Sequence, residues 1–266
     1  MKRKNVILSL VIFLPIIIVL LVDIMFLNNK HPMMSGYASN FVTEYLGIAI
    51  TVFIIQKIFD KYKEVDDKQQ ELEKIKRKQK IIKLVIENYF KYFYYVVTPK
   101  NKRTNANIIP NEFDFDDLID MYEPTDSTLD PYFQPAIENF IVWEKQIREH
   151  FLDLINEINF TYYKSIEKLM LDFIQVSIKN DVSNTLIKMQ TAIAATTNND
   201  GGQTKESLSS FLTKFLPRIK ILHEKYKNGD VNKDDPFMPF YILYDLLSAE
   251  KNILEQYNEE INNMVN

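Results

Sequence analysis

The chain of 266 residues contains no cysteine, only five glycines and only three histidines, and each shortage excludes a class of chemistry. Without cysteine there is no disulfide framework and no thiol nucleophile, and a zinc site lacks ligands. The few glycines form neither a G-x-x-x-x-G-K loop nor a G-x-G-x-x-G loop for phosphate, and no G-x-S-x-G elbow is present. The sequence therefore predicts no cofactor and no metal, and it favours a protein without catalytic activity of its own.

Long apolar runs are present, and both lie near the N-terminus. Residues 5–27 are almost entirely apolar, which is long enough for a membrane span of roughly 20 residues. The alternative is a cleaved signal peptide, but the apolar region of a signal peptide should measure only about 7 to 15 residues. The second run, residues 39–59, is less dense. We expect the two runs to form a two-helix transmembrane hairpin over residues 1–59.

Basic residues near the ends of the two runs predict the orientation of the hairpin. Lysine and arginine occupy positions 2–4 and recur between positions 57 and 68, whereas the loop 28–37 carries one lysine and one histidine. Both termini should therefore lie in the cytoplasm. The many lysine, asparagine and isoleucine residues suit an AT-rich bacterial genome. The expected location is a bacterial cytoplasmic membrane, with the lipid bilayer as one partner of this multi-pass chain.

Four residues of the hairpin are candidate functional positions within its apolar pattern: Pro15, Asp23, Asn40 and Glu44. Pro15 is expected to kink the first helix, which neighbouring helices tolerate in lipid. Asp23 and Glu44 would lie at matching depths in an antiparallel hairpin. Both carboxylates can reach the outer interface, or they can face a helix seam or an ion path together with Asn40 and Thr43. The sequence leaves both alternatives open.

The rest of the chain predicts helices throughout, so the expected fold class is all-α. Residues 60–97 contain no glycine or proline and should form a long juxtamembrane helix, or stalk. Residues 98–135 form an acidic connector that contains prolines. Residues 136–266 place apolar residues at steps of three and four, which is typical of a helical bundle. We expect this cytoplasmic bundle to pack against residues 81–97.

Two parts of the chain are candidate interaction surfaces. The aromatic residues of the juxtamembrane helix can pack into the core or contact a partner, and the connector adds a cluster of carboxylates that lacks the ligand spacing of a calcium loop. The candidate residues are Tyr89, Tyr92, Tyr94, Tyr95, Asp116 and Asp117. A protein partner or self-association is expected. Residues 104–266 carry 27 acidic and 14 basic residues, so DNA is excluded and RNA is not favoured as a partner.

One spacing is typical of an enzyme. Arg218 and His223 form an R-x4-H pattern, which resembles the catalytic motif of the HEPN ribonucleases, a family of helical bundles. The resemblance implies that the arginine and the histidine act together at a phosphodiester. Here Ile219 follows the arginine, where that family usually has a polar residue, and the acidic surroundings repel RNA. A membrane-anchored HEPN-like ribonuclease is therefore our third interpretation.

The overall organisation resembles that of uncharacterised bacterial proteins with a two-helix N-terminal anchor and a cytoplasmic helical domain. The resemblance rests on residues 41–53, with the sequence FVTEYLGIAITVF, and on the Lys/Glu-rich helix that follows. Some proteins of this organisation are membrane effectors in anti-phage systems. Our first interpretation is a membrane-anchored cytoplasmic helical interaction or sensor protein. The alternative, which the resemblance implies, is an oligomerising membrane-disrupting effector, for example in anti-phage defence.

Overall fold

The computed structural model describes residues 14–19, 21, 24, 32–103, 110–125, 134–189, 208–230, 235 and 237–265. These residues are mainly helical and contain no β-strand; their only extended pairing is an isolated bridge between Pro124 and Pro135. The expected all-α class is confirmed. Within this part of the chain, one helical stretch is long and apolar enough to span a membrane.

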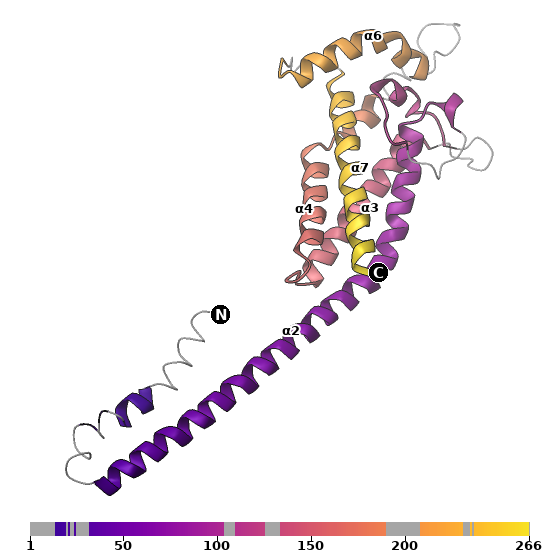
Figure 1. Cartoon of the computed structure of the whole chain (residues 1–266). Coiled ribbons are helices and arrows are strands. Elements are labelled where there is room, and N and C mark those ends of the chain that lie inside the picture. Colours follow the sequence, from indigo (N-terminus) through magenta and orange to yellow (C-terminus); the bar gives the residue numbers. More distant parts are fainter. Residues whose placement is uncertain are drawn as a thin grey trace, which may run out of the picture. The chain divides into compact units, whose positions relative to one another are not determined.

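The α-helices follow one another along the chain with two short 3-10 helices between the first two (Figure 1). The α-helices are α2 (Pro32–Val96), α3 (Ala136–Glu157), α4 (Lys164–Lys179), α6 (Leu208–Lys227) and α7 (Met238–Val265). The 3-10 helices are η2 (Lys100–Lys102) and η3 (Phe115–Asp120). Helix α2 covers the predicted second membrane helix and almost all of the predicted juxtamembrane helix. It ends before Thr98-Pro99, because a proline disfavours the helical conformation of the residue that precedes it.

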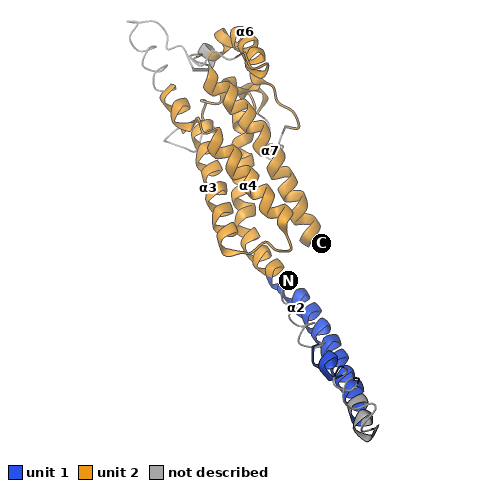
Figure 2. Ribbon diagram, turned by 90° about the vertical axis from the view of Figure 1, so that its left-hand side faces the viewer, with its two compact units in different colours: residues 1–70 blue, residues 71–266 orange. Residues whose placement is uncertain are grey.

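The chain divides into two compact units, residues 1–70 and residues 71–266, and the boundary lies within α2 (Figure 2). The second unit holds α3, α4, α6, α7 and the last part of α2. In both views α3, α4, α7 and that part of α2 lie side by side. Helix α4 contacts both α3 and α7, and α6 contacts η3.

One hydrophobic core fills the interior of residues 71–266, and the helices α2, α3, α4 and α7 all contribute to it. The buried side chains recur at steps of three and four residues, which places them on one face of each helix. On α3 these residues are Ile137, Phe140, Ile147, Phe151 and Leu154. Full burial of one such side chain contributes roughly 1.5–3 kcal/mol, so this core is the main source of stability.

Candidate functional site

In residues 1–70, most of the described apolar side chains of α2 are exposed. Those between positions 48 and 59 are 45–69% exposed, and they occupy adjacent positions: Ile48, Ile50, Val52, Phe53, Ile54, Ile55, Ile58 and Phe59. Because a helix has 3.6 residues per turn, such a run covers every face of the helix. A soluble protein rarely exposes so large a continuous apolar surface, whereas a bilayer would cover it on all sides.

The four candidate positions of the predicted hairpin differ in their surroundings. Asn40 and Glu44 lie on α2 and are exposed, and Pro15 lies in the helical piece 14–19 and is half-buried. Asp23 lies outside the described residues. The suggested pairing of Asp23 with Glu44 therefore stays a prediction.

Polar and small residues form one face of α2 within its apolar segment. Asn40, Glu44, Gly47 and Thr51 follow one another at steps of three and four, so they share that face. The hydroxyl of Thr51 donates to the carbonyl of Gly47 at 2.8 Å. Glu44, Gly47 and Thr51 also line a shallow hollow. This face offers polar groups to a neighbouring helix.

The aromatic residues of α2 divide between the core and the surface. Tyr89 and Tyr94 are buried, so they cannot form an exposed contact surface, and the expectation that they do is corrected. Their rings belong to the interior of residues 71–266, which is the core-packing alternative. Tyr92 and Tyr95 are partly exposed; Tyr92 stacks on Trp143 with 6.5 Å between ring centroids. These two tyrosines keep their place as candidate contact residues.

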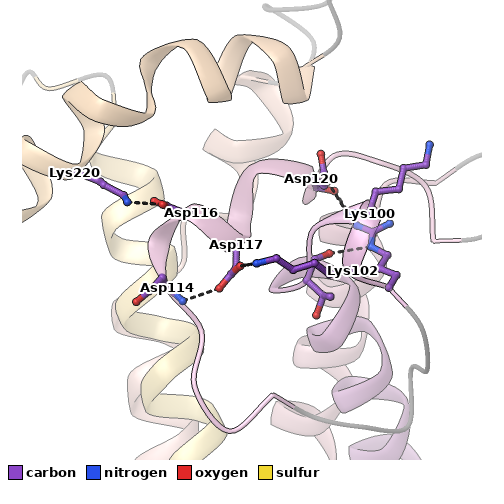
Figure 3. A network of polar contacts seen from close by, with 9 residues as sticks. Lys100, Lys102, Asp114, Asp116, Asp117, Asp120 and Lys220 are labelled. Carbon is purple, nitrogen blue, oxygen red and sulfur yellow. Dashed lines mark hydrogen bonds and ion pairs between the residues drawn. The ribbon is translucent and has the colours of Figure 1, made fainter.

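The carboxylates of the connector lie beside lysines of the same chain (Figure 3). Asp116 forms an ion pair with Lys220 of α6, and an oxygen of Asp117 lies 3.2 Å from Nζ of Lys102. The other oxygen of Asp117 accepts a hydrogen bond of 2.9 Å from the backbone of Asp114, as part of a capping box at the start of η3. Asp116 and Asp117 therefore stabilise the connector, and their charge is largely balanced within the chain.

Arg103 connects the end of α2 to the connector. Its guanidinium donates to the carbonyls of Tyr95 at 2.8 Å, Thr98 at 2.9 Å, Asp120 at 3.1 Å and Pro124 at 3.2 Å. The last carbonyls of a helix have no partner within the helix, and arginine has enough donors to satisfy several of them. Sequence reasoning missed this role, because an arginine in a polar loop has no distinguishing pattern.

Arg218 and His223 both lie on α6 but in different surroundings. Arg218 is exposed, whereas the ring of His223 is buried among Phe115, Tyr241 and Tyr244, with centroid distances of 5.1–5.5 Å to these rings. Residues five positions apart lie about 140° apart around a helix, so the two side chains leave α6 in different directions. Burial lowers the pKa of His223, which favours its neutral form. This placement does not favour a shared phosphodiester site.

A buried polar cluster lies inside the hydrophobic core and draws on four helices. Its members are Tyr89 of α2, Glu144 and Arg148 of α3, Ser177 of α4 and Glu250 of α7. The hydroxyl of Tyr89 donates to Oε2 of Glu250 at 2.8 Å, and the hydroxyl of Ser177 donates to Oε1 of Glu144. Nη1 of Arg148 donates to Oγ of Ser177 at 3.0 Å and lies 3.9 Å from Oε1 of Glu144.

The electrostatics of this buried cluster are unbalanced. Glu250 is completely buried, and its Oε1 atom has no hydrogen-bond partner among the described residues. Burial, and then the nearby charge of Glu144, raise the pKa of Glu250 well above its usual range. Burial also raises the pKa of Glu144 to about 7, although Arg148 lowers it. Removing a carboxyl group from water disfavours its charged form, and a second carboxylate nearby adds to this effect.

Sequence reasoning missed the buried cluster, but a signal for it exists in the helical repeat. Glu144 lies four residues after Phe140 and three before Ile147, and Glu250 lies three residues after Leu247 and four before Leu254. Each glutamate thus occupies a core position of its helix. A carboxylate at such a position is expensive to bury unless it is neutralised or paired, so it marks a site with a specific role.

No known protein family, curated protein or solved structure matches this chain. The class of the protein is therefore defined by its own architecture: an all-helical protein with one helical stretch that is long and apolar enough to span a membrane. Within the described residues, no group of three or more histidine, aspartate or glutamate side chains could hold a metal ion.

Proposed function

We propose that the protein is a membrane-anchored, cytoplasmic helical interaction or sensor protein without catalytic activity of its own. Residues 5–27 and 39–59 form a two-pass transmembrane hairpin, with both termini in the cytoplasm of a bacterial cell. Residues 71–266 form a helical bundle that the hairpin anchors to the membrane and that binds a protein partner or a second copy of the chain.

The observation that carries this proposal is the exposure of apolar side chains around α2 between positions 48 and 59. A lipid environment removes the cost of this exposure, and few charged residues interrupt the segment. Lys57, Lys61 and Lys63 follow at its C-terminal end, which supports a cytoplasmic location for that end. The partly exposed rings of Tyr92 and Tyr95 support contact with a partner, since aromatic residues are enriched in interfaces.

The experiment that separates an anchor from an active membrane element is the membrane potential of bacteria that express the full chain, beside cells that express residues 60–266. An anchored interaction protein leaves the membrane potential unchanged in both. Depolarisation by the full chain alone would contradict the anchor proposal and make the hairpin the active part. Exchange of residues 1–59 for an unrelated two-pass anchor then tests the same point, because an anchor can be exchanged without loss of partner binding.

The second candidate is an oligomerising effector that disrupts the membrane. The polar face of α2 formed by Asn40, Glu44 and Thr51 favours it, because polar groups within an apolar helix prefer a helix seam or a water-filled path to lipid. Its test is Glu44→Gln, with Glu64→Gln as the matched control on the same helix outside the apolar segment. An effector loses ion leakage with the first variant and retains it with the second.

A further inference from the structure

The buried cluster places one polar side chain from each of four helices at a core position. Tyr89, Glu144, Ser177 and Glu250 come from α2, α3, α4 and α7, and these helices lie side by side in Figure 2. Each of the two hydrogen bonds links two helices: Tyr89 with Glu250 links α2 to α7, and Ser177 with Glu144 links α4 to α3. A change of charge at this cluster acts on all four helices at once.

The charges of the cluster do not balance when every group has its ordinary state. Glu144 and Glu250 would contribute two negative charges, and Arg148 is the one cation among the groups that act on them. The hydroxyls of Tyr89 and Ser177 are neutral, and Asp181 adds a further negative charge beside Glu144. An isolated charge in a protein interior costs several kcal/mol, and a buried carboxyl group binds a proton instead.

We propose that Glu144 and Glu250 share a bound proton at neutral pH, and that this proton keeps α7 packed against α2 and α3. The proton resides mainly on Glu250. Arg148 lies 3.9 Å from Glu144 and stabilises its carboxylate, whereas Glu250 accepts the hydrogen bond of Tyr89 and forms no ion pair with Arg148 within the described contacts. The unpartnered Oε1 atom of Glu250 is the oxygen that is free to carry the proton.

The titratable and charged groups that face this site come from every helix packed against it. Helix α2 contributes Tyr89, α3 contributes Glu144 and Arg148, and α7 contributes Glu250. From the α4 side, Ser177 is neutral, and Asp181, which follows α4, adds a negative charge that raises the pKa of Glu144 further. Asp181 therefore raises the pKa of Glu144 further, whereas Arg148 lowers the pKa of both carboxyl groups and the hydrogen bond from Tyr89 lowers that of Glu250.

The direction of the pH dependence follows from the raised pKa of both carboxyl groups. A carboxyl group that binds its proton more tightly in the folded state stabilises that state fully below its unfolded pKa of about 4.3, and the contribution is lost as pH rises toward the folded pKa. For Glu144 the loss is complete near pH 7, and for Glu250 it continues above that. Mildly alkaline conditions therefore loosen the core.

The first test is thermal unfolding of the full chain in detergent micelles between about pH 5 and pH 9. The wild-type midpoint should fall by roughly 5 °C or more between about pH 6 and pH 8. Glu250→Gln keeps the shape of the side chain without its charge, so its midpoint should depend much less on pH and exceed that of the wild type at high pH. Glu259→Gln, an exposed change on the same helix, should follow the wild type. The proposal is overturned if both Glu144→Gln and Glu250→Gln show the same pH dependence of the unfolding midpoint as the wild type.

The second test is infrared spectroscopy, in which the wild type alone shows whether a protonated carboxyl group is present and the variants then identify it. Infrared spectra of the full-length wild type at neutral pH should contain the carbonyl band of a protonated carboxyl group, because exposed carboxylates are ionised there. Glu250→Gln should remove this band, and Glu44→Gln should not. A wild-type spectrum without the band, or a band lost only with Glu44→Gln, would contradict a proton bound at Glu250.

Discussion

Two regions of α2 contain many apolar residues but have opposite surroundings. Between positions 48 and 59 the large apolar side chains are exposed, whereas between positions 75 and 97 most of them are buried in the core of residues 71–266. The difference lies in the charges. Glu44 and Lys57 are the only charged residues between positions 40 and 59, whereas positions 75–97 contain six lysines or arginines and one glutamate. A helix with one charged face packs against protein and meets water, whereas an apolar helix without such a face suits lipid.

The largest effect is expected from a substitution in the buried region of α2. Phe93→Ala removes a completely buried ring and should lower the free energy of unfolding of residues 71–266 by about 3–5 kcal/mol. Phe53→Ala removes the same side chain from the exposed region and should leave that free energy unchanged. Denaturant unfolding in micelles measures both. Similar losses for the two variants would mean that Phe53 is also part of a folded core.

The second prediction uses a matched pair on one helix. Ile54 and Ile81 are 51% and 53% exposed, so exposure alone does not distinguish them. In residues 28–266, which lack the first predicted span, Ile54→Lys should place a charge in lipid at a cost of about 3 kcal/mol and move a large share of the protein out of the carbonate-resistant membrane fraction. Ile81→Lys should leave the chain in that fraction, because its position meets water. An equal distribution of both variants would contradict the assignment of residues 39–59 to the bilayer.

The third prediction concerns the end of the buried region. Arg103→Ala leaves four carbonyl groups without their donor and should cost about 2 kcal/mol of unfolding free energy. Arg77→Ala is the matched control, because Arg77 lies exposed on α2, and such a change usually alters stability by less than about 0.5 kcal/mol. Equal stabilities would show that Arg103 does not close the end of α2.

The smallest effect is expected at an exposed contact of the connector. Lys220→Ala removes the ion pair with Asp116 and should cost less than about 1 kcal/mol, because water screens a pair of this exposure. Unfolding at low and at high salt should give nearly the same small difference. A loss as large as that of Phe93→Ala would mean that the connector, and not the core, limits the stability of residues 71–266.

Much of the fold was accessible from the sequence. The repeat of Ile137, Phe140 and Phe151 predicts the buried face of α3, and similar repeats predict those of α4 and α7. The exclusion of strands is confirmed for the described residues. These features depend on spacing along one helix, which a sequence displays directly.

The polar contacts were not accessible, for a physical reason. Tyr89 and Glu250 are separated by 161 positions, and only the packing of α2 against α7 brings them together. The run of residues 89–95 consists of six aromatic residues and one lysine. Such a run does not indicate which side chains point inward, so the sequence offers Tyr89 and Tyr94 as contact residues although both are buried. Long-range pairs depend on helix packing, which one sequence does not specify.

The central claim is that residues 39–59 cross a membrane, and the chain is well suited to test it because it has no cysteine. Tyr37→Cys and Tyr62→Cys introduce single thiols at positions that are 75% and 71% exposed on the two sides of this segment. A membrane-impermeant maleimide, applied to bacterial spheroplasts, should label Tyr37→Cys at once and Tyr62→Cys only after lysis. Equal labelling of both thiols before lysis would contradict a membrane span between them.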